Sequence, residues 1–167
     1  SGDMPDFGPL DQPWESFQDE IETATIGAGV TSVGENAFAN CSALTDVTLP
    51  AGLKTIGEDA FGGCEKLASI TLPSSLQTLG VAAFSGCDAL TRIELPAALE
   101  TIGTNALNAG GLTEIKVQTG NTHFEAEGGV LYNKGKTKLL RYPPKKPGTT
   151  FAVPASVTTI EAYAFSK

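Results

Sequence analysis

Residues 50–72 read PAGLKTIGEDAFGGCEKLASITL, and this stretch decides the fold because the chain repeats it. Close copies occupy residues 27–49 and 73–95, and a fourth copy at 96–117 is one residue shorter. A fifth copy starts at Pro154 and runs part-way to residue 167. A fixed period of about 20–29 residues, with apolar residues at fixed positions, is typical of a solenoid whose units are too small to bury a core alone. The sequence therefore predicts one stacked domain.

Each copy contains a short segment in which apolar residues follow the pattern L-x-x-L-x-L, as in Leu44, Val47 and Leu49. Alternation over the last three residues predicts a strand, and copies stacked about 4.8 Å apart form a parallel sheet. Later copies are led by Leu67, Leu90 and Leu112. We therefore predict a leucine-rich repeat solenoid, a curved parallel β stack of 23-residue units with short turns and little regular helix.

The remaining fixed positions define the turns and the far edge of the core. A proline follows each predicted strand and ends it, because proline has no N–H for the ladder. A second apolar pair follows, such as Leu53 and Ile56, and then a recurrent glycine, such as Gly57, which indicates either positive φ or close packing. An Ala-Phe pair, such as Ala60 and Phe61, places one small and one large residue at the other edge of the core.

Two segments interrupt this order, and they set the predicted boundaries within the single domain. Residues 1–26 hold no recognised repeat and are interpreted as a lead-in, with Trp14 and Phe17 expected to cap the first repeat. Residues 27–117 are four repeats, 118–153 an insertion, and 154–167 the start of a fifth repeat. The insertion contains Val130 and its neighbours, a Lys134-Gly135 turn and a run ending at Tyr142, which predicts a hairpin.

Charge excludes two classes of partner. Eleven Lys and Arg against 19 Asp and Glu give a net charge of −8. Nucleic acid and anionic membranes both attract basic surfaces, so we expect neither as a partner, and no apolar run is long enough to predict membrane insertion.

Because the chain ends inside a repeat, we expect either a longer protein or self-association that covers the open end of the solenoid.

No pattern predicts a catalytic residue, a metal site or a cofactor. Cys41, Cys64 and Cys87 recur at one spacing, but such a column does not converge on a point as zinc ligands must. We interpret them as buried, reduced thiols that fill the core, in preference to a disulfide between neighbours. His123 is the only histidine and is interpreted as a loop residue, since no partner for base or metal chemistry recurs around it.

Two surfaces are candidates for binding. The first is the exposed side of the predicted strands, where residues two apart form columns along the solenoid. Its members are Asp46, Thr48, Ser69, Thr71, Arg92, Glu94, Glu114 and Lys116. The second is the basic insertion, which holds six of the eleven positive charges and which could equally be a hairpin edge kept soluble by lysines. Its members are Lys134, Lys136, Lys138, Arg141, Lys145 and Lys146.

The repeat resembles that of the BspA-like leucine-rich repeat proteins, whose unit reads roughly C-x-x-L-x-x-I-x-L-P-x-x-L-x-x-I-G-x-x-A-F. The match runs from Cys41 to Phe61 and from Cys64 to Phe84, and the run from Gly129 to Pro143 is similar to another recurrent segment of the family. The chain departs from the pattern at Gly110 and at Glu161. The resemblance implies a secreted or surface-attached bacterial protein that adheres to host or microbial surface proteins, matrix or glycans.

From these observations we expect a non-enzymatic extracellular module that binds proteins through the sheet face, the basic insertion or both. The alternative is a structural spacer that holds another domain away from the cell. The sheet face lacks aromatic residues of the kind that dominate binding hot spots, which leaves both interpretations open.

Overall fold

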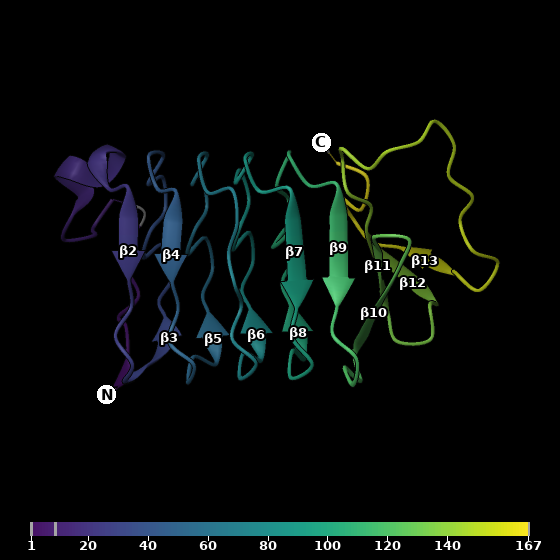
Figure 1. Cartoon of the computed structure of the whole chain (residues 1–167), viewed down its shortest axis with the longest axis horizontal. Coiled ribbons are helices and arrows are strands. Elements are labelled where there is room, and N and C mark those ends of the chain that lie inside the picture. Colours follow the sequence, from purple (N-terminus) through teal and green to yellow (C-terminus); the bar gives the residue numbers. More distant parts are fainter. Residues whose placement is uncertain (1, 9, 167) are drawn as a thin grey trace.

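The computed structural model describes residues 2–8 and 10–166, and it confirms the predicted fold. The chain forms a β-solenoid of about six turns with repeats of about 23 residues and almost no helix. Figure 1 shows the turns side by side in sequence order, from the N-terminal end to β9. In the described residues the one helix is a short 3₁₀ segment at Glu15–Glu20, and none is long and apolar enough to cross a membrane.

One side of the solenoid carries an unbroken parallel sheet whose strands were not predicted from the sequence. Its register places Ser32 beside Thr55, Thr55 beside Thr78, and Thr78 beside Thr101. The residues that follow Ser32, Thr55 and Thr78 in the chain point into the core and are fully buried. They are Val33, Ile56 and Leu79. In sheet order the strands are β1 Gly2–Asp3, β3 Val30–Val33, β5 Thr55–Ile56, β6 Thr78–Leu79 and β8 Thr101–Ile102.

The opposite side carries the predicted strands, but they pair as two separate sheets. β2 Thr23–Thr25 pairs with β4 Asp46–Thr48, and β7 Arg92–Leu95 pairs with β9 Glu114–Val117. The segment between them, residues 67–72, has no strand pairing, so the predicted strand there is absent. Its side chains keep the alternation all the same, because Leu67 and Leu72 are buried while the residues at 69 and 71 are exposed.

The core is a stack of equivalent side chains, one from each turn. Phe38, Phe61 and Phe84 are buried and stack with ring centroids 5.4 and 5.6 Å apart and planes within 3° of parallel. The fourth turn places the buried Leu107 in this column. The predicted edge of the core is thus confirmed for these four turns, whereas Phe165 of the last repeat is 47% exposed.

The recurrent glycines serve close packing and not positive φ. Gly57 lacks a positive φ, and a Cβ atom at this residue would lie 2.8 Å from the backbone nitrogen of Glu35. That separation is much shorter than carbon–nitrogen van der Waals contact, so the turns stack this closely only where the side chain is absent.

The lead-in forms part of the stack. Trp14 takes the aromatic position ahead of Phe38, with centroids 5.3 Å apart, and its Nε1 donates to the carbonyl oxygen of Ala37 at 3.0 Å. Thr23 lies beside Asp46 one full period later. Trp14 therefore caps the first repeat as expected, whereas Phe17 remains 49% exposed and does not.

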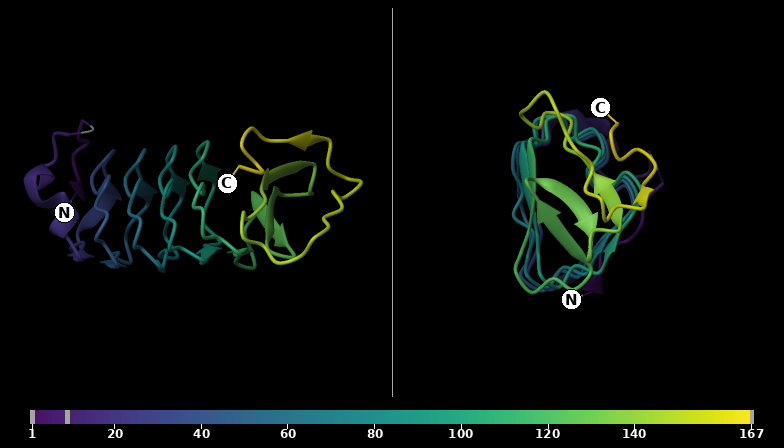
Figure 2. Two further views of the ribbon diagram at one scale, coloured as in Figure 1. Left: turned by 90° about the horizontal axis from the view of Figure 1, so that it is seen from above. Right: turned by 90° about the vertical axis from the view of Figure 1, so that its right-hand side faces the viewer.

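The insertion forms the predicted hairpin and extends it to four strands. β11 Val130–Asn133 and β12 Lys138–Arg141 pair antiparallel, and β10 Phe124–Glu127 lies on the other side of β11. β13 Thr159–Ile160, which belongs to the last repeat, pairs parallel with β12 and not with β8. The right-hand view in Figure 2 shows these strands lying across the end of the solenoid.

β12 therefore replaces a solenoid strand as well as forming a hairpin. The backbone nitrogen of Glu161 donates to the carbonyl oxygen of Leu139 at 2.9 Å, just as that of Gly80 donates to Ile56 earlier in the stack at 2.7 Å. The backbone nitrogen of Tyr142 donates to the carbonyl oxygen of Ala164 at 2.7 Å, as the phenylalanines of the core column donate to the next turn. The insertion is thus built into the stack at this edge.

Candidate functional site

The exposed face of β2, β4, β7 and β9 presents two columns of side chains along the solenoid. The ladders place Arg92 beside Glu114 and Glu94 beside Lys116, in the predicted alignment. They also place Thr23 beside Asp46 and Thr25 beside Thr48. Thr23 and Thr25 were not predicted as members of the face. The sequence feature that could have revealed this strand is the Thr-Ala-Thr alternation at residues 23–25. It is too short to predict a strand without knowledge of the partner strand.

All but one of the predicted face residues are exposed, and Glu114 is half-buried. Glu114 lies between two cations, with its Oε2 3.7 Å from Arg92 Nε and 3.7 Å from Lys116 Nζ. Ion pairs this exposed contribute little to stability, so these charges remain available to a partner. Most charges of the face lie on β7 and β9, with Asp46 on β4 as the exception, while hydroxyl side chains form the columns at β2.

The basic insertion is less free than its sequence suggested. Lys136 Nζ lies 2.8 Å from Glu127 Oε2, and this hydrogen bond raises the pKa of Lys136. Lys138 Nζ lies 3.4 Å from Glu161 Oε1. Among the described residues no ion pair involves Lys134, Lys145 or Lys146, so these three are the lysines that remain for contact with a partner.

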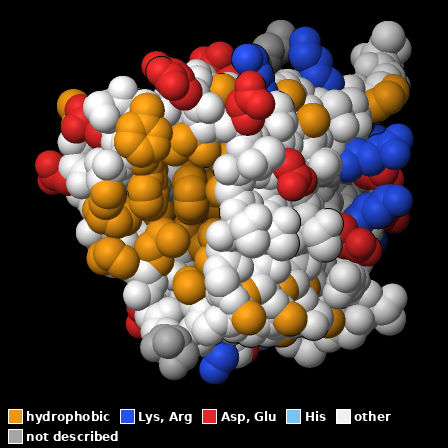
Figure 3. All heavy atoms as spheres, turned by 60° about the vertical axis from the view of Figure 1, so that its left-hand side comes forward, with side chains coloured by type: hydrophobic (Ala, Val, Ile, Leu, Met, Phe, Trp, Pro, Cys, Tyr) orange, Lys and Arg blue, Asp and Glu red, His pale blue; other side chains and the backbone are white. Residues whose placement is uncertain are grey.

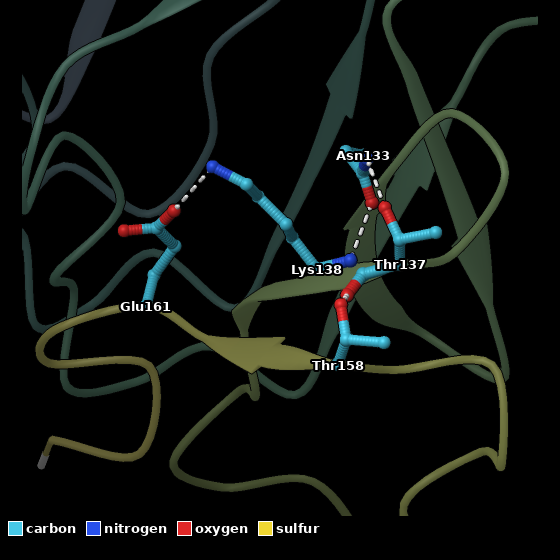
Figure 4. A network of polar contacts seen from close by, with 5 residues as sticks. All are labelled: Asn133, Thr137, Lys138, Thr158 and Glu161. Atoms are coloured by element: carbon cyan, nitrogen blue, oxygen red, sulfur yellow. Dashed lines mark hydrogen bonds and ion pairs between the residues drawn. The ribbon is translucent and has the colours of Figure 1, made fainter.

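Polar contacts fix the hairpin turn to the last repeat (Figure 4). The Lys138 backbone nitrogen donates to Asn133 Oδ1 at 2.6 Å, and Asn133 Nδ2 donates to Thr137 Oγ1 at 2.9 Å. Thr158 Oγ1 donates to the carbonyl oxygen of Thr137 at 3.2 Å. The Lys138–Glu161 pair belongs to this network, which favours a structural role for Lys138.

Arg141 was predicted to belong to the basic contact surface, and that prediction is wrong. Its side chain is only 5% exposed, and burial lowers its pKa. Nη1 donates to the carbonyl oxygen of Tyr163 and to Ser166 Oγ, each at 2.8 Å, while Nη2 donates to Asn108 Oδ1 at 3.0 Å. The alternation of β12 points this residue inward, because Leu139 and Arg141 share one side of the strand.

The cysteines are buried, as predicted, and none is in a disulfide. Cys64 Sγ donates to the carbonyl oxygen of Phe38 at 3.2 Å, and Cys87 Sγ donates to Phe61 at 3.1 Å. Burial, followed by the charge of Asp19, raises the pKa of Cys41 to about 11. Cys41 therefore stays protonated near neutral pH, and the interpretation of the three cysteines as core-filling side chains fits their burial.

His123 lies exposed in the loop before β10, where its Nδ1 is 3.2 Å from Thr122 Oγ1. Across residues 2–8 and 10–166, no three His, Cys, Asp or Glu side chains gather in a way that could hold a metal ion. The arrangement around His123 assembles no base and nucleophile pair.

The N-terminal end of the solenoid carries an apolar surface. Met4, Phe7, Ile21 and Ala24 are only partly buried although they pack against the core, and Phe17 in the 3₁₀ segment is exposed. Figure 3 shows hydrophobic side chains gathered on the side of the molecule that holds this end. A solenoid exposes such a surface wherever a turn has no further turn stacked on it.

A family model described as the BspA type leucine rich repeat region matches six copies over residues 15–128. A leucine-rich repeat protein from Eubacterium ventriosum is 31% identical, with a TM-score of 0.78, over 99% of this chain and 50% of its own. A leucine rich cell surface protein from Faecalibacterium prausnitzii is 25% identical, with a TM-score of 0.58, over 98% and 55%.

The pneumococcal vaccine antigen PcpA is 25% identical, with a TM-score of 0.70, over 86% of this chain and 42% of its own. No curated protein matches the sequence. The chain thus spans about half the length of the solved structures that it resembles.

Proposed function

Because the chain belongs to the BspA-type leucine-rich repeat family, we propose that it is a non-enzymatic binding module of a bacterial surface protein and that it contacts other proteins through the exposed face of β2, β4, β7 and β9. The observation that carries the proposal is the pair of aligned columns on that face. They form one extended, shallow and largely uncommitted surface, which is how solenoids present binding sites. Two relatives whose names describe a cell surface protein and a vaccine antigen support an extracellular location.

The charged end of the face is the expected centre of contact. Arg92, Glu94 and Lys116 are exposed, and they alternate in sign over two adjacent strands. A partner with the complementary alternation would gain specificity and a faster association rate, more than raw affinity. Because large aromatic anchors are absent from the columns, we expect single contacts to be weak and adhesion to depend on several copies.

The basic insertion is a secondary surface in this proposal. Two of its five exposed or half-buried lysines already pair with Glu127 and Glu161. The other three, Lys134, Lys145 and Lys146, could meet an acidic partner. A net charge of −8 on the whole chain makes association with a polyanion through three lysines alone unfavourable at physiological salt.

The test is binding of the purified chain to immobilised host matrix proteins, bacterial surface proteins and glycans. The proposal predicts reproducible binding that is lost when Arg92, Glu94 and Lys116 are replaced together by alanine. Replacing Lys54, Gln77 and Glu100 is the matched control, because these three exposed residues form a column of their own, 23 residues apart, beside the other sheet. Replacing Lys134, Lys145 and Lys146 tests the insertion separately.

The alternative function is a spacer that holds a further domain away from the cell. The unbroken five-stranded sheet favours it, since a continuous hydrogen-bonded stack keeps the module stiff. Binding to no member of a broad panel, or binding that survives the sheet-face substitutions, would support the spacer and overturn the proposed use of this face.

A further inference from the structure

A cavity of about 240 Å³ lies at the junction between the fourth turn and the last repeat. The fourth turn contributes residues 102–108, the insertion contributes Phe124, Leu131 and Leu140, and the last repeat contributes residues 161–163. Arg141 lines the cavity too. The lining of the cavity includes no residue of the sheet-face columns, and the cavity plays no part in the function proposed above.

The cavity exists because one turn of the stack is too short. Four residues separate Ile56 from Phe61 in a regular turn. Only two, Leu140 and Arg141, separate Leu139 from Tyr142. Leu139 and Tyr142 nevertheless make the same backbone hydrogen bonds to the next turn as Ile56 and Phe61 do. The space that two residues would fill in a complete turn is left open beside the loop at residues 103–107.

The polar groups around this space are incompletely satisfied. Arg141 Nε is buried and has no hydrogen-bond partner, and the same holds for Asn105 Oδ1. One is a donor and the other an acceptor, and both residues line the cavity. A buried polar atom without a partner is costly, so a ligand or water that satisfied both would stabilise the protein.

The charge balance favours an anion over a neutral ligand. The three hydrogen bonds of Arg141 go to a backbone carbonyl, a hydroxyl and an amide, so no carboxylate neutralises this buried guanidinium. Glu161, the acidic residue of the lining, pairs with Lys138 instead. A buried cation without a counterion is costly, and a carboxylate is the anion that a guanidinium binds with the best geometry.

We propose that this cavity binds a small carboxylate that has an apolar body and one hydrogen-bond donor. The carboxylate accepts from Arg141 Nε, the donor reaches Asn105 Oδ1, and the apolar body packs among Phe124, Leu131 and Leu140. The volume is below the roughly 300–1,000 Å³ of drug-sized sites, which limits the bound group to about the size of a single amino acid derivative. Free hydroxy or acylamino acids and the carboxyl terminus of a peptide share this chemistry.

The experiment measures binding of α-hydroxyisocaproate and N-acetyl-leucine to the whole chain by calorimetry, with the corresponding amides as neutral controls. We expect the acids to bind at least about tenfold more tightly than the amides and to raise the melting temperature, because a charged hydrogen bond is lost in the amide. A leucine-terminated tetrapeptide and its amide distinguish the source, since binding of the peptide acid indicates that the cavity admits a chain terminus.

Two variants locate the site. Leu140→Phe fills the cavity without changing Arg141, and it is expected to abolish binding of the acids while the chain stays folded. Arg141→Lys keeps the charge but removes Nε, and it should weaken the acids at least about tenfold with little effect on the amides. Lys134→Ala, outside the cavity, is the matched control. Equal binding of acids and amides, binding that survives Leu140→Phe, or a cavity that holds water only would overturn the proposal.

Discussion

The Sγ atom of Cys64 donates a hydrogen bond to the carbonyl oxygen of Phe38 at 3.2 Å, and so links the second turn of the core to the turn before it. The hydrogen bond to Cys87, together with burial, holds the pKa of Cys64 well above its usual range. The cysteine column thus contributes packing and a weak polar contact between turns, and Cys64 stays protonated while the chain is folded.

Stability should fall between about pH 9 and 11 because of Cys41. In the unfolded chain its thiol ionises near pH 9, whereas in the folded chain its pKa is about 11. Below pH 9 the thiol is protonated in both states, and above it only the unfolded state gains from ionisation, so the free energy of unfolding decreases. Urea unfolding at pH 7 and pH 10.5 measures the loss, on the order of 2 kcal/mol for Cys41. Cys41→Ala should lose correspondingly less stability between these pH values, and an equal loss would contradict the assignment.

The aromatic column should be the most sensitive part of the core. Phe61 is fully buried between Phe38 and Phe84. Phe61→Ala is expected to reduce the free energy of unfolding by about 3–5 kcal/mol, since it leaves a cavity in the stack. Phe61→Leu should cost less, because the fourth turn already uses Leu107 there. Phe17→Ala, at an exposed aromatic residue, serves as the control and should change stability by less than about 1 kcal/mol.

Close stacking of the turns can be tested at one glycine. Gly57→Ala would place Cβ 2.8 Å from the Glu35 nitrogen and 2.9 Å from the Gly34 carbonyl carbon. Both are backbone atoms that cannot rotate away, so we expect a loss of more than about 2 kcal/mol in chemical denaturation. At Gly52 an added Cβ meets nothing within 4 Å, and Gly52→Ala should be close to neutral. Similar effects of the two substitutions would refute the packing role.

The charges of the sheet face should be removable without harm to the fold. Glu114 pairs with Arg92 and Lys116 at 3.7 Å, with all three side chains at least a third exposed. Glu114→Gln is expected to change the melting temperature by only a few degrees, because exposed pairs contribute about 0–1 kcal/mol. A large destabilisation would show that this cluster supports the sheet, and loss of binding in its variants would then be ambiguous.

The period and the alternation of apolar residues were enough to predict the repeat, the inward side chains and the position of the hairpin. The second sheet was missed because Thr55 and Ile56 form a strand of only two residues, too short for alternation to register. Thr23–Thr25 escaped notice for the same reason. These strands are defined by neighbours one turn away, and a single copy of the pattern does not contain that information.

Charge alone misplaced Arg141. The sequence shows six cations close together, but the side of β12 on which each lies depends on how the strand stacks against Thr159 and Ile160. That pairing joins segments about 21 residues apart across an insertion that breaks the 23-residue period. The short turn from Leu139 to Tyr142, and the cavity beside it, follow from the same break.

The break in pairing at residues 67–72 also has a mechanical consequence. On one side, five strands join β1 to β8 without interruption, whereas on the other side two ladders are separated by an unpaired segment. A load that bends the solenoid therefore meets unequal resistance, and we expect it to flex by opening the face between β4 and β7. A module anchored at one end would then bend in a preferred direction, with the face at residues 67–72 on the outside of the curve.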